Sequence, residues 1–363
     1  MIRCGIMRPV WIAIFTSLLL TSSIKAQTPT EAMQGLPTDS REVFKAAAAL
    51  YDFSDPKQKP WHMKVSYQIY NEKGEQKDQG TFEYWWASPD VYRTTWTRGG
   101  SVHSEWHLAG GKHAYVGSGP AMEYFEYRLR TALLAPIPSE EALDPAKVHL
   151  QKDDLHSGKL NIPCYMLVPN NLSSFGHKGA LSSVPSGLFP TYCFDPAKPI
   201  LHANYSWGAV LTEYDRFSLV QSHVLPKQVD LYENGKKTLS AQVGEITGIS
   251  ASEEALVPPP GEVKEGSNSI SLDSEKVAEI SHPRVQPVYP IDAKREHITG
   301  TVKMKAIIGK DGGIHDLQVI SAPWPSLVES AISAVSRWRY KPYLVKGDPV
   351  EVNTEINVVY FLP

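Results

Sequence analysis

Three polar side chains at alternate positions are the first candidates for chemistry in this sequence of 363 residues. His103, Glu105 and His107 fall on one face of a predicted strand, a spacing that can bring three metal ligands together. No fourth ligand is evident, so we interpret them as the polar face of a half-buried strand and predict no metal. Ser118 lies between two glycines but lacks the spacing of a nucleophile elbow, and no glycine-rich phosphate loop is present. The sequence therefore predicts no catalytic residue, no cofactor and no enzyme activity.

The elements that must position this strand form a large antiparallel sheet. A helix is expected from Ser40, because apolar residues then recur at spacings of three and four. Four strands follow as a meander that is rich in aromatic residues. A helical segment from Met122 to Leu134, ended by prolines, separates them from further strands that reach Ile249. The fold class expected for residues 40–250 is α+β.

This order of elements resembles the LolA and LolB type of antiparallel half-barrel. That family binds acyl chains or lipidated proteins on the concave face of its sheet, so the resemblance implies an apolar cavity with a lipid or lipidated protein as partner. The candidates to line the cavity are Trp61, Tyr67, Phe82, Tyr84, Trp86 and Trp106. The alternative is that these rings fill the core between sheet and helix, since aromatic side chains are large core residues.

The last stretch, from Gln286 to Pro363, has the pattern of a complete small domain. Apolar and polar residues alternate from Ile298 to Ile308, and a turn with two glycines follows. A helix is expected to begin at Ser326, which forms a capping box with Glu329. A long half-buried strand closes the chain, because residues 350–360 alternate between apolar and polar.

These segments together resemble the C-terminal domain of TonB. The six matches, in chain order, are Gln286-Pro287-Val288-Tyr289-Pro290, Gly300-Thr301-Val302, the Asp311-Gly312 turn, residues 331–335, the segment RWRYKP at 337–342 and the terminal strand. The family implies a small two-layer α/β domain in the periplasm, with helices on an antiparallel sheet. It also implies that a short extended segment of an outer-membrane receptor or transporter adds as a strand beside the last strand. In such β-augmentation, main-chain hydrogen bonds give affinity and side-chain pockets give specificity.

The predicted partner-binding site follows from this resemblance, position by position. Gln286, Pro287, Tyr289 and Pro290 match the family's motif. The candidates on the terminal strand are Val350, Val352, Asn353, Glu355 and Asn357. The alternative is that Tyr289 packs under the domain to fix a turn and that the edge strand binds nothing.

The start of the chain has the layout of a secretory signal peptide. Arg3 and Arg8 precede an apolar run from Val10 to Leu20, and the small residue Ala26 stands at the expected cleavage site. The apolar run is shorter than the ~20 residues that span a bilayer. We therefore expect export to the periplasm or cell envelope with removal of residues 1–26, an uncleaved inner-membrane anchor being the alternative.

Two cysteines remain after such cleavage, Cys164 and Cys193. Because an exported protein meets an oxidising compartment, the sequence predicts a disulfide between them. Two unpaired buried thiols are the alternative.

Residues 251–283 lose apolar periodicity, and Pro, Ser and Glu dominate. This composition indicates a flexible linker, so the domains at 40–250 and 284–363 are expected to fold independently. The net charge of −3, without a concentrated basic face, argues against nucleic acid as a partner.

Two functions from different classes are therefore considered. In the first, a TonB-family envelope protein captures transporter segments and supports energy-dependent transmembrane transport. The chain departs from the family's full-length pattern, because it lacks a convincing membrane anchor and a long proline-rich spacer, and this weakens the expectation of coupling to the proton-driven motor. In the second, the half-barrel carries a lipid or lipoprotein and the TonB-type module is a docking domain.

Overall fold

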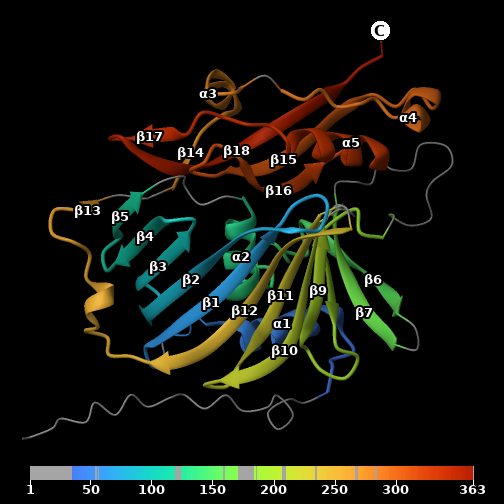
Figure 1. Ribbon diagram of the computed structural model, residues 1–363. Helices are drawn as coiled ribbons and strands as arrows, with labels where there is room; N and C mark the ends of the chain where they lie inside the picture. The colour runs from blue at the N-terminus through green and yellow to red at the C-terminus, as the bar shows by residue number, and fades with distance from the viewer. Residues whose placement is uncertain are drawn as a thin grey trace, which may run out of the picture.

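The chain folds around two sheets, a large one and a small one at the C-terminus (Figure 1). The computed structural model describes residues 35–362, except for 54, 56, 119–123, 158–159, 171–183, 185, 207–209, 234, 266–268 and 283. The predicted signal peptide, residues 1–26, lies outside the described residues. We call residues 40–248 the large-sheet unit and residues 269–362 the small-sheet unit.

The large sheet is antiparallel and open. Its strands are β1 (Trp61–Tyr70), β2 (Gln76–Ser88), β3 (Val91–Arg98), β4 (Ser101–Leu108), β5 (Lys112–Ser118), β6 (Val148–Ser157), β7 (Leu160–Pro169), β8 (Thr191–Phe194), β9 (Leu201–Ser206), β10 (Val210–Val220), β11 (His223–Glu233), β12 (Lys236–Gly248) and β13 (Val263–Glu265). Their spatial order is β13-β5-β4-β3-β2-β1-β12-β11-β10-β9-β8-β7-β6. Two meanders, β1 to β5 and β6 to β12, thus join through the pairing of β1 with β12.

Two helices, α1 (Ser40–Tyr51) and α2 (Tyr124–Leu134), lie where the large sheet curves around them (Figure 1). The Asp39 carboxylate accepts hydrogen bonds from the first amides of α1, which sets where that helix begins. Buried and less buried residues alternate along β1, so this strand presents one apolar face to the helices. Together with the small sheet, this confirms the predicted α+β class.

A disulfide links Cys164 on β7 to Cys193 on β8. The two residues are directly opposite each other in the antiparallel pairing, and both side chains are fully buried. The predicted pairing is confirmed.

The small-sheet unit packs helices on a second sheet. Its elements are β14 (Ser269–Ser271), α3 (Ser274–Glu279), α4 (Ile291–Arg295), β15 (Gly300–Ile308), β16 (Ile314–Ser321), α5 (Pro325–Val335), β17 (Tyr343–Val345) and β18 (Asp348–Tyr360). The order is β14-β18-β15-β16, and β17 pairs with β18. The pairing of β14 with β18 is parallel, unlike the antiparallel sheet expected from sequence. Helix α5 begins at Pro325 without the expected Ser326 cap, because proline already fixes the first helical φ.

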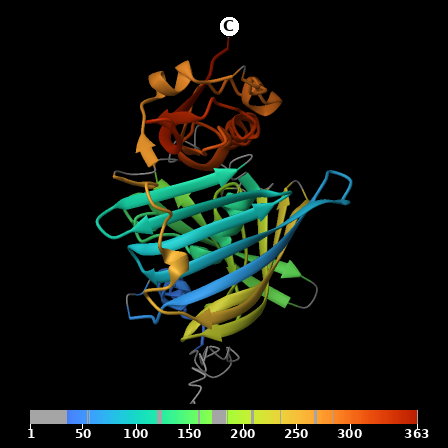
Figure 2. The same cartoon turned by 60° about the vertical axis from the view of Figure 1, so that its left-hand side comes forward.

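The segment predicted to be a flexible linker carries regular structure in its described residues. Its elements are η3 (Glu254–Leu256), β13, β14 and α3. It runs along the edge of the large sheet, where β13 pairs with β5, and then reaches the small sheet, where β14 pairs with β18 (Figure 2). Strand addition to an edge uses main-chain hydrogen bonds, so it leaves no apolar periodicity for sequence analysis to detect.

The two units also share packed side chains. Met166, Val168 and Phe189 of the large-sheet unit belong to the same buried cluster as the core of the small sheet. Arg130 of α2 lies 3.6 Å from Glu351 of β18. The two parts thus contact each other directly as well as through residues 251–283, and their independent folding stays a prediction.

Candidate partner-binding edge

Strand β18 divides its side chains between the core and the surface. Val350 and Val352 are 4% and 1% exposed, so they face the interior. Asn353, Glu355 and Asn357 lie on the opposite phase and are exposed. The predicted role of Val350 and Val352 in contacting a partner is thus unsupported, because period-two alternation turns both side chains into the core.

The backbone of β18 has one edge against β15 and a second edge that is only partly covered. On the second edge, the Leu272 amide donates to the Asn353 carbonyl over 3.0 Å. The N–H and C=O of one residue point to the same side of a strand and alternate between successive residues, so Glu355, Asn357 and Val359 also present theirs to this side. Strand β14 covers residues 351–353 of this edge. In the described part of the chain, no strand pairs with residues 355–359 there.

Tyr289 fixes the segment that runs beside the uncovered edge. Its hydroxyl donates to the carbonyl of Ile298, and its ring meets the Tyr360 ring edge-on with centroids 5.4 Å apart. Tyr360 in turn donates to the Leu327 carbonyl over 3.2 Å, and burial raises the pKa of its phenol. The packing role considered for Tyr289 is real, and it places the tyrosine against the end of β18.

Two further hydrogen bonds hold the same segment to α5 and to the residues that follow α5. The indole Nε1 of Trp338 donates to the Val285 carbonyl over 2.8 Å, and the Ser330 hydroxyl donates to the Val288 carbonyl. Pro290 is the residue that precedes α4, where it has extended backbone geometry. Residues 285–290 are thereby fixed in place before any partner binds.

A groove of about 290 Å³ separates this segment from the end of β18. Its lining residues are Arg284, Gln286, Pro287, Tyr289, Trp338, Asn357, Val358, Val359, Tyr360 and Phe361. The groove brings together four predicted residues, Gln286, Pro287, Tyr289 and Asn357, whereas Pro290, Asn353 and Glu355 lie outside its lining.

Sequence reasoning missed, among other lining residues, two exposed apolar residues of the groove. Val359 and Phe361 are 62% and 72% exposed, although they are large and apolar. Val359 stands on the phase of β18 that is otherwise polar, and Phe361 directly follows the strand, a signal that the sequence already contained. Arg284 was also missed, and its guanidinium lies 4.7 Å from the Trp338 ring, a cation–π distance that places a positive charge at the groove.

Comparison with known proteins identifies the part of the chain that carries this edge. Residues 285–362 match the family described as Gram-negative bacterial TonB protein C-terminal. Protein TonB of Klebsiella pneumoniae is 32% identical over 117 residues, which are 32% of this chain and 41% of that protein. Protein TonB of Escherichia coli K12 is 38% identical over 60 residues, which are 16% of this chain and 25% of that protein. The chain thus spans less than half of the length of these relatives.

Solved structures resemble the other part only weakly. A LolA superfamily protein from Nitrosomonas europaea aligns with 61% of this chain and 99% of its own at 6% identity, with a TM-score of 0.34. A DUF1329 family protein from Desulfovibrio piger covers 61% of this chain and 98% of its own at 9% identity, with a TM-score of 0.32. We use "TonB-type domain" below for residues 285–362.

The TonB-type domain touches the strand that carried the metal candidates. Glu105 accepts a hydrogen bond from Lys310 of that domain, and His103 Nδ1 lies 2.6 Å from the Tyr115 hydroxyl. Among the described residues, no group of three His, Cys, Asp or Glu side chains could hold a metal ion. Two residues of the predicted polar face of β4 therefore contact other side chains of the same protein.

The pKa values of two of these side chains follow from their burial at the contact. Burial raises the pKa of the Glu105 carboxyl, but the charge and hydrogen bond of Lys310 outweigh it and bring the pKa to about 2. Burial lowers the pKa of His107 to about 4, although Glu105 opposes this shift. Glu105 is thus ionised and His107 neutral near pH 7.

Five of the six aromatic candidates for a lipid cavity are buried in the core of the large-sheet unit. They are Trp61, Tyr67, Phe82, Tyr84 and Trp86. Trp106 is on the other face of the sheet. It pairs with Arg93, and Arg93 pairs with Trp85, so these three side chains share one face. Trp86 follows Trp85 along β2 and therefore points to the opposite face. Its indole donates to the Ala255 carbonyl over 3.0 Å, so the segment after β12 covers it. The prediction that all six residues line one cavity is therefore wrong for Trp106.

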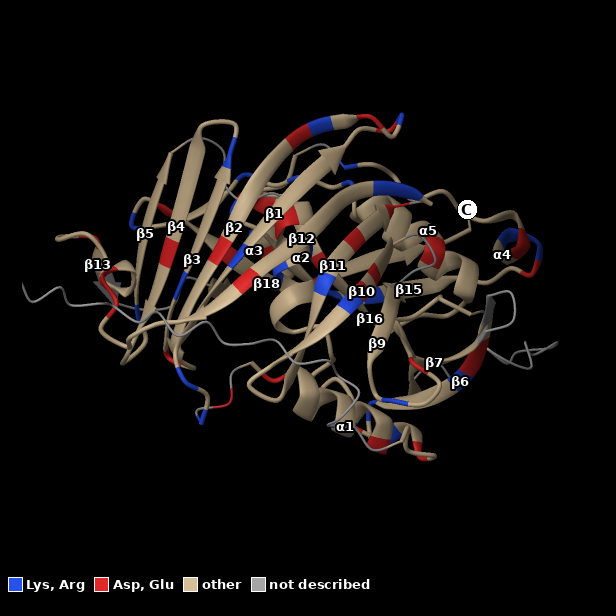
Figure 3. Cartoon of the chain, turned by 60° about the horizontal axis from the view of Figure 1, so that its bottom comes forward, with Lys and Arg blue, Asp and Glu red and all other residues tan. Residues whose placement is uncertain are grey.

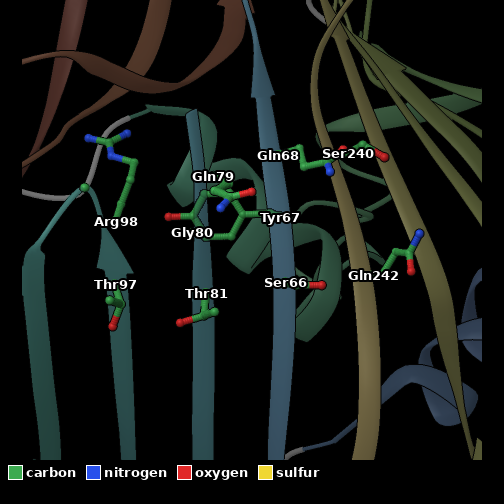
Figure 4. A pocket seen from close by; sticks show the side chains of 11 residues that line it. Ser66, Tyr67, Gln68, Gln79, Gly80, Thr81, Thr97, Arg98, Ser240 and Gln242 are labelled. Carbon is green, nitrogen blue, oxygen red and sulfur yellow. The ribbon is translucent and has the colours of Figure 1, made fainter. Parts of the chain in front are cut away.

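A groove of about 470 Å³ on the large sheet has a polar lining (Figure 4). Ser66, Gln68 and Gln242 are among its residues. The Tyr67 ring lies across Gly80, where a Cβ atom would stand only 2.4 Å from the tyrosine oxygen. Glycine at position 80 therefore makes room for Tyr67.

Charged residues of both signs are interspersed along the elements (Figure 3). This mixture agrees with the small net charge of −3. No helix in the described part of the chain has the length and apolar character needed to cross a membrane.

Proposed function

We propose that the TonB-type domain binds an extended segment of an outer-membrane transporter by adding it as a strand to β18, in support of energy-dependent transport across that membrane. The observation that carries this proposal is the uncovered edge at Glu355, Asn357 and Val359, beside a groove with fixed walls. Main-chain groups there can supply affinity, and the groove can select the partner's alternate side chains. The role is a binding role, not a catalytic one.

The proposal includes a location and an organisation of the chain. Residues 1–26 direct export and are removed, so that the protein works in the periplasm. The large-sheet unit then presents the TonB-type domain, and residues 251–283 connect the two parts. The homology to TonB proteins over the C-terminal part supports an envelope function.

The test replaces Asn357, whose N–H points to the uncovered edge. Asn357→Pro removes this donor but none of the hydrogen bonds to β15, which even-numbered residues make. We expect binding to weaken at least about tenfold, because strand addition depends on main-chain bonds. The probes are synthetic peptides that cover the periplasmic N-terminal segments of outer-membrane transporters from the same organism, measured by fluorescence anisotropy.

Asn357→Ser is the matched control. It changes the side chain and keeps the backbone donor, so we expect a loss below ~1 kcal/mol, the scale of a cross-strand pair. Thermal unfolding must show that both variants keep their fold. Strand addition at this edge is excluded if a folded Asn357→Pro variant binds the peptides as tightly as the unaltered chain.

A lipid-carrying function has weaker support. The five inward aromatic residues are packed in a core with α1 and α2, which fill the face of the sheet that a carrier would need to keep open. Mass spectrometry of the purified protein distinguishes the two functions. A lipid that copurifies in stoichiometric amount would favour the carrier.

A further inference from the structure

The partner-binding edge is already half occupied by another segment of the same chain. Strand β14 pairs with β18 from Glu351 to Asn353, and the uncovered part begins at Glu355. A partner strand that uses the whole edge must therefore take the place of β14. This inference rests on the proposed function, because it concerns access to the same edge.

The hold of β14 on the edge is small. It is a strand of three residues, Ser269–Ser271, and its neighbour Leu272 adds the hydrogen bond to the Asn353 carbonyl. Ile270 and Leu272 are only partly buried against the core of the small sheet. A segment with so few contacts can leave at low cost, since local opening is easiest where buried apolar contacts are few.

The flanking elements keep β14 close to the edge after it leaves. Strand β13 pairs with β5 of the large sheet on one side, and α3 buries Val277 on the other. A tethered competitor acts at high effective concentration, so even a weak strand can compete with a free partner.

We propose that β14 is an intramolecular competitor for the partner-binding edge and that capture of a long partner strand requires β14 to leave. The apparent affinity for a long partner is then reduced by the fraction of molecules whose edge is still covered. A short partner that pairs only with residues 355–359 escapes this competition. Because β14 lies between β13 and α3, its departure also alters the path of the segment that connects the two units.

Two variants shift β14 in opposite directions. Ser271 and Asn353 are directly opposite in the parallel pairing, and both are exposed, so Ser271→Cys with Asn353→Cys can lock β14 in place by a disulfide. Leu272→Pro removes the amide that bonds to Asn353 and favours release. Ser271→Ala is the matched control, because it keeps every main-chain bond.

The measurement is the affinity of the full mature chain for the transporter peptides described above, each in a long and a short form. The long form has about nine residues and the short form about five. At ~3.3 Å per residue, the long form can pair along the whole edge, whereas the short form can pair only with the part beyond Asn353. We expect the locked variant to bind the long form at least about fivefold more weakly and the release variant about threefold more tightly, as the covered fraction changes. Both variants should bind the short form like the unaltered chain.

Reduction should restore binding of the long form by the locked variant, and the unaltered chain treated with the same reductant controls for the native disulfide. The inference is overturned, and the proposed function stands, if Asn357→Pro weakens peptide binding while the locked and release variants bind the long form like the unaltered chain. If no peptide binds any variant, including the released one, the proposed function itself fails. Amide exchange at Leu272 supplies a second readout, because its protection must fall when the long form binds.

Discussion

Lys310, in the turn between β15 and β16, donates a hydrogen bond to the carboxylate of Glu105 on β4, 205 residues away in the sequence. Both side chains are largely buried, and the Lys310 ammonium also lies 5.2 Å from the Tyr115 ring. This ion pair ties the TonB-type domain to the large-sheet unit. It stands beside the contact of Arg130 with Glu351, so the domain is docked by charge as well as by apolar packing.

Removing the lysine should destabilise the protein strongly. Lys310→Met leaves the Glu105 carboxylate buried without its cation, which we expect to lower the free energy of unfolding by about 3 kcal/mol. Urea unfolding measures the change. Lys303→Met, an exposed lysine of the same sheet, should alter stability by less than ~0.5 kcal/mol. Equal effects of the two substitutions would show that the ion pair contributes nothing specific.

The free energy of unfolding should fall in acid in two steps, because two side chains at the contact between the units titrate. His107 has a folded pKa of about 4 against an ordinary 6.5, and Arg130, Lys310, His113 and Glu105 are the charged groups around it. Between these values the unfolded chain binds a proton that the folded chain does not, so the free energy of unfolding decreases as pH falls. Glu105, with a folded pKa of about 2 against 4.5, causes the same loss at lower pH.

The variant His107→Gln tests the first step, because glutamine stays neutral at every pH. Unfolding in urea is compared at about pH 7 and about pH 5. Both values lie above the pH range in which protonation of Glu105 lowers the free energy of unfolding. The unaltered chain should lose more stability between these values than the variant. Identical losses would exclude His107 as the group responsible.

Phe189 should be important for both units. It lies in the large-sheet unit but belongs to the buried cluster of the TonB-type domain. Phe189→Ala should therefore lower the free energy of unfolding by about 3–4 kcal/mol through the cavity it leaves. Leu155→Ala, at an exposed position on β6, should change it by less than ~0.5 kcal/mol. If Phe189→Ala is as harmless as this control, the two units do not support each other's cores.

Local pattern was sufficient for much of the fold. Period-two alternation predicted β1, β15 and β18, because a strand with one buried face requires that pattern whatever surrounds it. The pairing of Cys164 with Cys193 followed from their being the two cysteines left after cleavage, and the structure contains that disulfide. The resemblance to TonB over the last residues rested on motifs that are local in sequence, and the family match covers residues 285–362.

Contacts between distant segments were decided by the tertiary structure alone. The phase of β18 was readable in sequence, but the side on which its backbone is free depends on β14, which pairs through main-chain groups that every residue possesses. Trp106 looked like the other aromatic residues until strand register placed it on the opposite face. Glu105 had metal-ligand spacing, and only the docking of a turn 205 residues later supplied Lys310 as its partner. Sequence determines which residues can be buried or paired, whereas the partner of each is fixed by the packing of elements that local spacing does not encode.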